Sequence, residues 1–114
     1  MELVQILKWL AVGVTLAYGL WAMIKPGVVG RFTGLETSGS RATTEIRAAL
    51  GGTFLGLAIA VVVLNDPSGF KMLGICYAAI AVIRAVSMAL DRTADRGNAI
   101  SLIVETGLAI LLVL

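Results

Sequence analysis

Four long apolar runs, at residues 3–24, 42–64, 70–90 and 97–114, constrain this chain more than any other feature. Each has close to the ~20 residues that a helix needs to cross the ~30 Å apolar core of a bilayer. The chain is 59% apolar and only 14% charged, whereas about 25% of the residues of a soluble domain are charged. We therefore predict an all-α integral membrane protein with four transmembrane helices in a lipid bilayer.

The connections between the runs predict the arrangement of the helices. Pro26 ends the first helix, and the long connection at 25–43 has enough apolar residues to place part of it along the membrane surface. The other two connections, at 65–69 and 91–97, are short. Short links make neighbouring helices antiparallel. We predict a single domain, residues 1–114, folded as an antiparallel four-helix bundle.

Basic residues predict the orientation of the helices, because cytoplasmic loops of membrane proteins carry an excess of lysine and arginine. Only Lys8 and Lys71 lie toward the side away from the first and third connections. Lys8 is expected to extend to the membrane surface. Six basic residues lie at the first and third connections: Lys25, Arg31, Arg41, Arg47, Arg92 and Arg96. We predict these two connections on the cytoplasmic side and both termini on the outer side.

Arg84 is the charge that most needs a partner, because it lies well inside the third apolar run. Its guanidinium cannot be deprotonated, and an unpaired charge inside a membrane costs several kcal/mol. If the last two helices fold about the middle of their connection, Arg84 and Glu105 reach the same depth, about 10 Å inside the helix ends. We predict a buried salt bridge between these two side chains.

Polar residues near this pair form two stripes with helical spacing. Ser87 and Asp91 follow Arg84 at i+3 and i+7 on one face of the third helix. Asn98 and Ser101 have the same spacing with Glu105 on the fourth helix. The two stripes are expected to face each other, with Asp91 opposite Asn98.

The start of the second run carries a charged and glycine-rich segment. Glu45 shares a helix face with Gly52 and Gly56, and small residues at this spacing let membrane helices approach closely. We expect Glu45 to point into the bundle, on the side of the salt bridge. Arg47 either reaches toward headgroups or packs inward beside Gly51. We expect these three glycines to serve helix packing inside the bundle, with dimerisation as the alternative.

The sequence lacks residues that several kinds of functional site need. The chain has no histidine, the usual general base and a common metal ligand, so we expect no metal site, no catalytic residue and no cofactor. The lone cysteine, Cys76, has no partner for an intrachain disulfide. The net charge is only +2, and the basic residues lie at the helix ends, so nucleic acid is not an expected partner.

The stretches "TEIRAALGGTFLGLAI", "IRAVSMALD" and "IVETGLAI" resemble an uncharacterised family of short bacterial inner-membrane proteins, known only as a domain of unknown function. The most specific part is the pattern of Glu45, Arg47, Gly51 and Gly52, and Arg84 and Glu105 match the family's charged positions in the last two helices. The resemblance implies a four-helix membrane fold in a bacterial inner membrane, with no established activity. A weaker likeness links the family to small four-helix families associated with quinones or redox complexes.

The charged residues admit two interpretations. They form either a structural clasp that sets the helix register, or a polar pocket that opens to the cytoplasmic side and binds an ion, a proton or a small ligand. The near balance of charge favours the clasp, whereas ionisable residues inside membranes favour function. The residues of this pocket would be Glu45, Arg47, Arg84, Asp91 and Glu105.

Three functions follow from these interpretations. The first is a non-catalytic accessory or structural subunit that docks to a larger membrane complex, with another membrane protein or a second copy as its partner. The second is a small transporter or a carrier of a ligand, lipid or quinone. The small multidrug-resistance transporters, however, use an acidic residue in the first helix, and besides hydroxyl groups this run has only Gln5 and Lys8. The third is an enzyme with Glu45 or Glu105 as acid–base group, but no nucleophile or metal cluster accompanies either carboxylate, so an enzyme is the least favoured.

Overall fold

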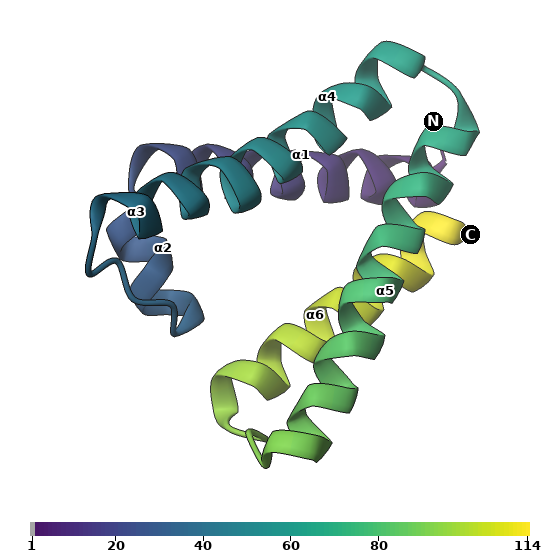
Figure 1. Ribbon diagram of the computed structural model, residues 1–114. Helices are drawn as coiled ribbons and strands as arrows, with labels where there is room; N and C mark the ends of the chain where they lie inside the picture. Colours follow the sequence, from purple (N-terminus) through teal and green to yellow (C-terminus); the bar gives the residue numbers. More distant parts are fainter. Residues whose placement is uncertain (1) are drawn as a thin grey trace. The chain divides into compact units, whose positions relative to one another are not determined.

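The computed structural model describes residues 2–114, and every regular element in that range is a helix (Figure 1). The elements are α1 (Leu3–Ile24), α2 (Pro26–Thr33), α3 (Ser40–Glu45), the π-helix η1 (Ile46–Gly52), α4 (Thr53–Leu64), α5 (Pro67–Asp91) and α6 (Arg96–Val113). Four segments are long and apolar enough to cross a membrane: Leu3–Ile24, Ser40–Leu64, Pro67–Asp91 and Arg96–Val113. The predicted all-α class with four such helices is confirmed.

The connection after α1 contains a helix of its own. Lys25 separates α1 from α2, and Pro26 opens α2 at a position where a missing N–H is tolerated. Helix α2 ends at Gly34, whose φ of 79° lies in the left-handed region that glycine adopts at helix C-termini. The Thr33 hydroxyl donates to the Val29 carbonyl at 2.8 Å and strengthens this last turn.

The second membrane-length segment is one continuous helix with a wide turn inside it. Ser40–Leu64 runs as α3, η1 and α4 without a break. The π-helix spans "IRAALGG", so the distinctive part of the sequence is also the irregular part of the helix. Glycines have low α-helix propensity, and π-turns are rare insertions that shift the faces of the residues after them.

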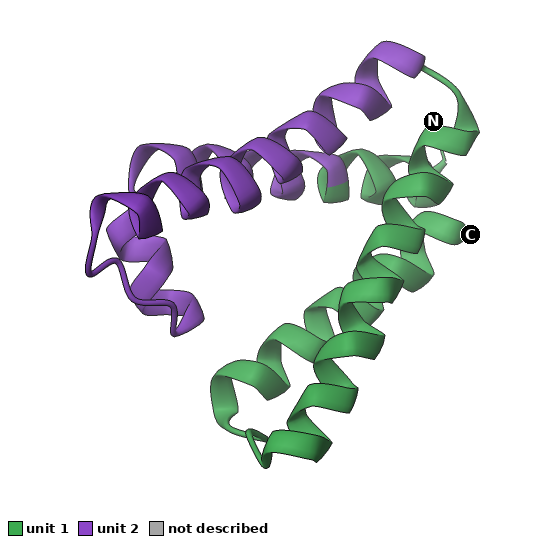
Figure 2. Cartoon of the chain, in the orientation of Figure 1, with its two compact units in different colours: residues 1–11, 65–114 green, residues 12–64 purple. Residues whose placement is uncertain are grey.

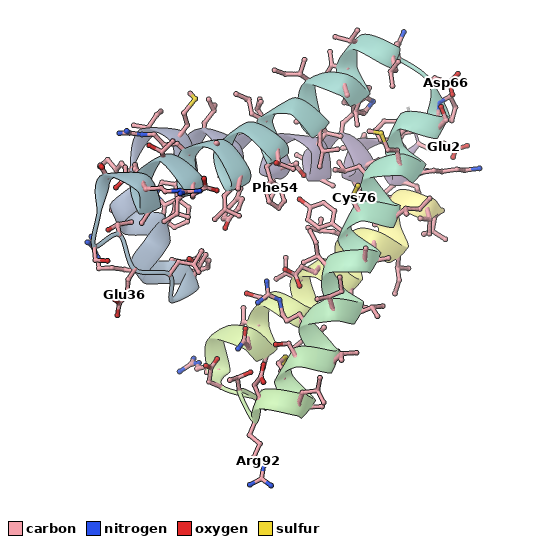
Figure 3. All side chains as sticks on the ribbon, viewed as in Figure 1. Glu2, Glu36, Phe54, Asp66, Cys76 and Arg92 are labelled. Carbon is pink, nitrogen blue, oxygen red and sulfur yellow. The ribbon has the colours of Figure 1, made fainter. Side chains whose placement is uncertain are left out.

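Helices α5 and α6 begin at capped N-termini. The Asp66 carboxylate accepts a hydrogen bond of 2.8 Å from the Ser68 N–H, and Pro67 is the first residue of α5 (Figure 3). The Asp95 carboxylate caps α6 in the same way, accepting from the Asn98 N–H at 2.8 Å. Because these caps start the helices early, the two turns are shorter than the predicted connections at 65–69 and 91–97.

The described residues form two compact units (Figure 2), residues 12–64 and residues 1–11 with 65–114. Helix α1 contributes its first turns to one unit and its remaining turns to the other. Each unit is described by itself below, and the single four-helix domain stays a prediction.

The core of the unit 12–64 lies where α1, α2 and η1 meet. Ala22, Val29 and Ile46 are buried together, and Tyr18, Trp21 and Leu50 pack against them. The Tyr18 ring meets the Phe54 ring edge-on, with centroids 5.0 Å apart. Aromatic rings at the end of a membrane helix are typical of the membrane–water interface.

The core of the other unit lies between α5 and α6. Buried Leu73, Tyr77 and Ala81 come from α5, and buried Ala109 and Leu112 come from α6. A Cβ at Gly74 would lie 3.0 Å from the Leu112 Cβ, so the glycine permits close approach of these helices.

Lys8 lies beside an aromatic ring of α5. It is buried, with 9% of its surface exposed, and its Nζ lies 5.7 Å from the centroid of the Phe70 ring. The Trp9 ring meets the same ring edge-on at 5.0 Å. The aromatic face offers the ammonium a favourable contact, and the extension of Lys8 to the membrane surface stays a prediction.

Large apolar side chains are exposed on every membrane-length segment. Leu10 is 60% exposed, Val63 73%, Leu90 77% and Ile103 72%. In water this much apolar surface would be unfavourable, whereas lipid tails cover it at no such cost.

Candidate functional site

Arg84 of α5 and Glu105 of α6 meet in a two-pronged ion pair. The Arg84 Nε donates to Glu105 Oε1 at 2.8 Å, and Nη2 donates to Oε2 at 2.8 Å. Both contacts are parallel N–H···O bonds between planar groups, the strongest geometry open to an arginine and a carboxylate. The predicted pairing is confirmed, and we call this pair the clasp.

The clasp is less buried than predicted. The side chain of Arg84 is 30% exposed and that of Glu105 is 13% exposed, so the pair is half-buried rather than buried. Arg84 also lines an open cavity, which accounts for its larger exposed fraction. The expectation of a fully buried salt bridge was wrong on this point.

Asn98 completes the hydrogen bonding of the clasp. Its Oδ1 accepts from Arg84 Nη1 at 2.9 Å, and its Nδ2 donates to the Thr93 carbonyl at 2.8 Å. One amide side chain thus connects the guanidinium to the loop between α5 and α6. Side-chain hydrogen bonds therefore stabilise the helix pair both at the clasp and at the loop between α5 and α6.

The two polar stripes meet through Arg84, which contacts both Glu105 and Asn98. The Asp91 carboxylate accepts from the hydroxyl of Ser87 at 3.0 Å, one turn back on its own helix, and both residues are exposed. Asn98 reaches Arg84, and the placement of Asp91 opposite Asn98 stays a prediction. Ser101 is half-buried on α6.

A cavity of about 410 Å³ opens beside the clasp. Ile80, Ile83 and Met88 supply apolar surface, and Arg84, Ser87 and Asn98 supply polar atoms. Its volume falls in the range of small-molecule sites, about 300–1,000 Å³. Since Glu105 cancels the charge of Arg84, this cavity suits an uncharged molecule with an apolar part and hydrogen-bonding groups.

Arg47 has a structural contact in the unit 12–64. Its Nε donates to the carbonyl of Met23 at 3.1 Å, in the last turn of α1, where carbonyls lack partners inside the helix. A cation is also favoured there by the negative end of the helix dipole. Of the two alternatives for Arg47, the structure shows the contact toward α1. Glu45 is exposed in the same unit, whereas Arg84, Asp91 and Glu105 belong to the other one.

The glycines that pack within this unit are only partly those that the spacing predicted. Gly51 is buried, and a Cβ there would lie 3.1 Å from the backbone N of Met23. Gly52 and Gly56 are exposed, and no atom lies within 4 Å of a Cβ built at Gly56. They do not provide the packing within this unit that was expected of them, because the π-turn brings Gly51 to the face of α1.

Gly19 is the packing residue that sequence reasoning missed. A Cβ on Gly19 would lie 2.6 Å from the backbone N of Leu55 and 3.0 Å from the carbonyl oxygen of Gly51. The helices therefore touch backbone to backbone at this point. The spacing of glycines within one run does not reveal it, since Gly19 and Gly51 lie on different runs.

Residues 2–114 contain no group of three acidic, histidine or cysteine side chains that could hold a metal ion. Cys76 is a half-buried free thiol on α5.

The chain matches one known family. The model of a family described as a domain of unknown function (DUF4345) matches residues 3–114. No curated protein matches the chain. No solved structure matches it either.

Proposed function

The chain belongs to the DUF4345 family, a domain of unknown function, and from its own residues we propose that it is a non-catalytic accessory subunit that docks to a larger membrane complex. The observation that carries this proposal is the clasp. Arg84 holds both carboxylate oxygens of Glu105 at 2.8 Å and a third acceptor on Asn98. A charge-neutral pair with this many hydrogen bonds fastens two helices together.

Other polar groups of the chain also serve the fold. Asp66 and Asp95 cap α5 and α6, and Arg47 binds the end of α1. These three charged side chains are thus engaged in helix ends and helix packing. This supports a function in which the surface of the chain contacts a partner.

The exposed faces of the second membrane-length segment support a protein partner. Gly52 and Gly56 lie four residues apart on this segment, both exposed, and small residues at this spacing let a second membrane helix approach its backbone. We propose a helix of another membrane protein as the occupant of this face.

Photo-cross-linking in native membranes tests the proposal. A photoreactive residue at position 52 or 56 should give one discrete adduct with another protein, and the same residue at Ile103, an exposed position of α6, should give none. Gly56→Leu should abolish the adduct formed from position 52. Lipid adducts alone at all three positions, or adducts only between copies of the chain, would contradict the proposal.

A second candidate function, a carrier of an uncharged lipid or quinone, is favoured by the cavity beside Arg84. Ile83→Trp should fill this cavity while leaving the clasp in place, because Ile83 lines it. Extraction and mass spectrometry of the purified protein would measure the bound molecule. The carrier function predicts a lipid or quinone that is lost in Ile83→Trp and kept in the control Ile103→Trp; equal contents would contradict it.

We also propose a bacterial inner membrane as the location, with both termini on the periplasmic side. The support is the resemblance in sequence and the basic residues around the first and third connections. A single cysteine placed in the loop at Ser38 should be protected from an impermeant thiol reagent in intact cells, in a Cys76→Ala background. A cysteine at Ser68 should be labelled. The reverse pattern would contradict this orientation.

A further inference from the structure

The segment from α2 to α3 forms an open surface cavity of about 430 Å³, and most of the residues that line it are exposed. It lies wholly within the unit 12–64, at the end of the helix pair formed by α1 and the second membrane-length segment. The cavity is lined by three glycines, an arginine, a glutamate, two hydroxyl residues and one leucine: Gly27, Gly30, Gly34, Arg31, Glu36, Thr37, Ser38 and Leu35.

Tight packing holds the walls of this cavity in place. Val29 is fully buried in the core with Ala22 and Ile46, which fixes α2 on the end of the helix pair. A Cβ at Gly30 would lie 2.7 Å from the Leu35 carbonyl oxygen and 3.2 Å from Thr37 Cγ2. The loop after α2 therefore lies directly on the helix, and the hollow beside it is a feature of the folded segment.

The polar groups of the cavity have opposite charges. Arg31 of α2 contributes a guanidinium and Glu36 a carboxylate, both exposed. Glu36 lies on the loop after α2 (Figure 3). Within the described residues neither side chain belongs to the ion pair, which joins Arg84 and Glu105. A guanidinium binds phosphate oxygens, whereas a carboxylate and hydroxyl oxygens accept hydrogen bonds from a primary ammonium.

Apolar side chains beside the cavity point to a ligand from the bilayer. Phe32 is 65% exposed and Leu35 51% exposed, and the Phe32 ring lies 5.5 Å from the Trp21 ring at the end of α1. An amphipathic helix with aromatic and basic residues at the end of a membrane helix is typical of the headgroup region. Acyl chains would lie along Phe32 and Leu35 while the headgroup enters the cavity.

We propose that this cavity binds the headgroup of a zwitterionic phospholipid with a primary amine, of the phosphatidylethanolamine type. Arg31 binds the phosphodiester. Glu36 and the hydroxyls of Thr37 and Ser38 accept the N–H groups of the ammonium. A quaternary ammonium has no N–H to donate, and an anionic headgroup meets the carboxylate of Glu36, so the cavity distinguishes among the three headgroups.

Native mass spectrometry of the full chain, titrated in detergent with phosphatidylethanolamine, phosphatidylcholine and phosphatidylglycerol of identical acyl chains, tests this assignment. We expect phosphatidylethanolamine to bind at least tenfold more tightly than the other two. Arg31→Gln and Glu36→Gln should each remove most of this preference. Gly27→Leu should block binding, because Gly27 lines the cavity and no atom lies within 4 Å of a Cβ built there, so a leucine has space to occupy it.

Matched controls separate the cavity from its surroundings. Arg41→Gln removes an exposed basic residue of the same connection, and Gly13→Leu adds the same side chain at an open position of α1; both should bind like the unaltered chain. Circular dichroism checks that each variant keeps its helix content. Equal binding of the three lipids, a preference for phosphatidylglycerol, or unchanged binding in the properly folded Arg31→Gln variant would overturn the proposal. Soluble glycerophosphoethanolamine that binds as tightly as the lipid would overturn the bilayer as the source.

Discussion

Arg84 Nη2 and Nε lie 2.8 Å from the two carboxylate oxygens of Glu105, across the interface of α5 and α6. The pair is half-buried, with 30% and 13% of the two side chains exposed, and Asn98 occupies a further N–H of the guanidinium. The contact neutralises the charge inside the third membrane-length helix and sets the register of the last two. The contact therefore gives Arg84 its partner and also holds α5 and α6 together.

Exchanging the two charges tests the clasp. Arg84→Glu or Glu105→Arg alone should lower the free energy of unfolding by about 2–4 kcal/mol, because each leaves two like charges facing each other in a half-buried position. The double exchange should recover part of the loss. Reversible unfolding in mixed detergent micelles measures these values, and a double variant no better than the worse single one would contradict a direct pairing.

Adding a methyl group at two glycines should have opposite effects. Gly19→Ala should destabilise the protein by about 1–3 kcal/mol, because the new Cβ meets the backbone N of Leu55 at 2.6 Å. Gly56→Ala, in open space on the same helix pair, should stabilise it by up to about 1 kcal/mol through helix propensity. The same unfolding assay measures both, and equal effects would show that α1 and α4 do not touch at Gly19.

Removing the side chain of Arg47 should weaken the end of α1. Arg47→Ala loses the 3.1 Å hydrogen bond to the Met23 carbonyl, and we expect a loss of about 1 kcal/mol. Hydrogen exchange of the amides at the end of α1 should quicken in this variant. Arg41→Ala, which removes an exposed basic residue of the same segment, is the control and should leave that exchange rate unchanged.

Asp66 should make the start of α5 sensitive to acid. Hydrogen bonds from the backbone N–H and the hydroxyl of Ser68 lower the pKa of Asp66 below its ordinary value of 3.8. The folded state therefore gains stability from the charged carboxylate above pH 3.8, and this gain is lost as the pH falls through the lowered pKa.

The matched variant is Asp66→Asn, which keeps an N-capping side chain but does not titrate. We expect the melting temperature of the unaltered chain to exceed that of Asp66→Asn at neutral pH, and the difference to shrink as the pH falls below 3.8. A difference that is constant over this range would show that the hydrogen bonds of Ser68 do not favour the charged form.

Local chemistry explains what could be predicted from the residues. Four runs of apolar residues can satisfy their backbone only as helices in a bilayer, and the structure has helices at each of them. Arg84 and Glu105 could be paired by counting from the turn, because an α-helix rises by a constant ~1.5 Å per residue and antiparallel neighbours keep equal depth. These inferences need only distances along the chain.

The features that only the tertiary structure decided are those that depend on which helix faces are in contact. The π-turn at Ile46–Gly52 brings Gly51 rather than Gly52 toward α1, and Gly19 becomes a contact because a glycine far along the chain lies opposite it. Asn98 reaches Arg84 across the helix pair, while the Asp91 carboxylate accepts from Ser87 of its own helix. The periodicity of a sequence shows which residues share a face of a regular helix, whereas a widened turn and the identity of the facing helix result from packing across the whole unit.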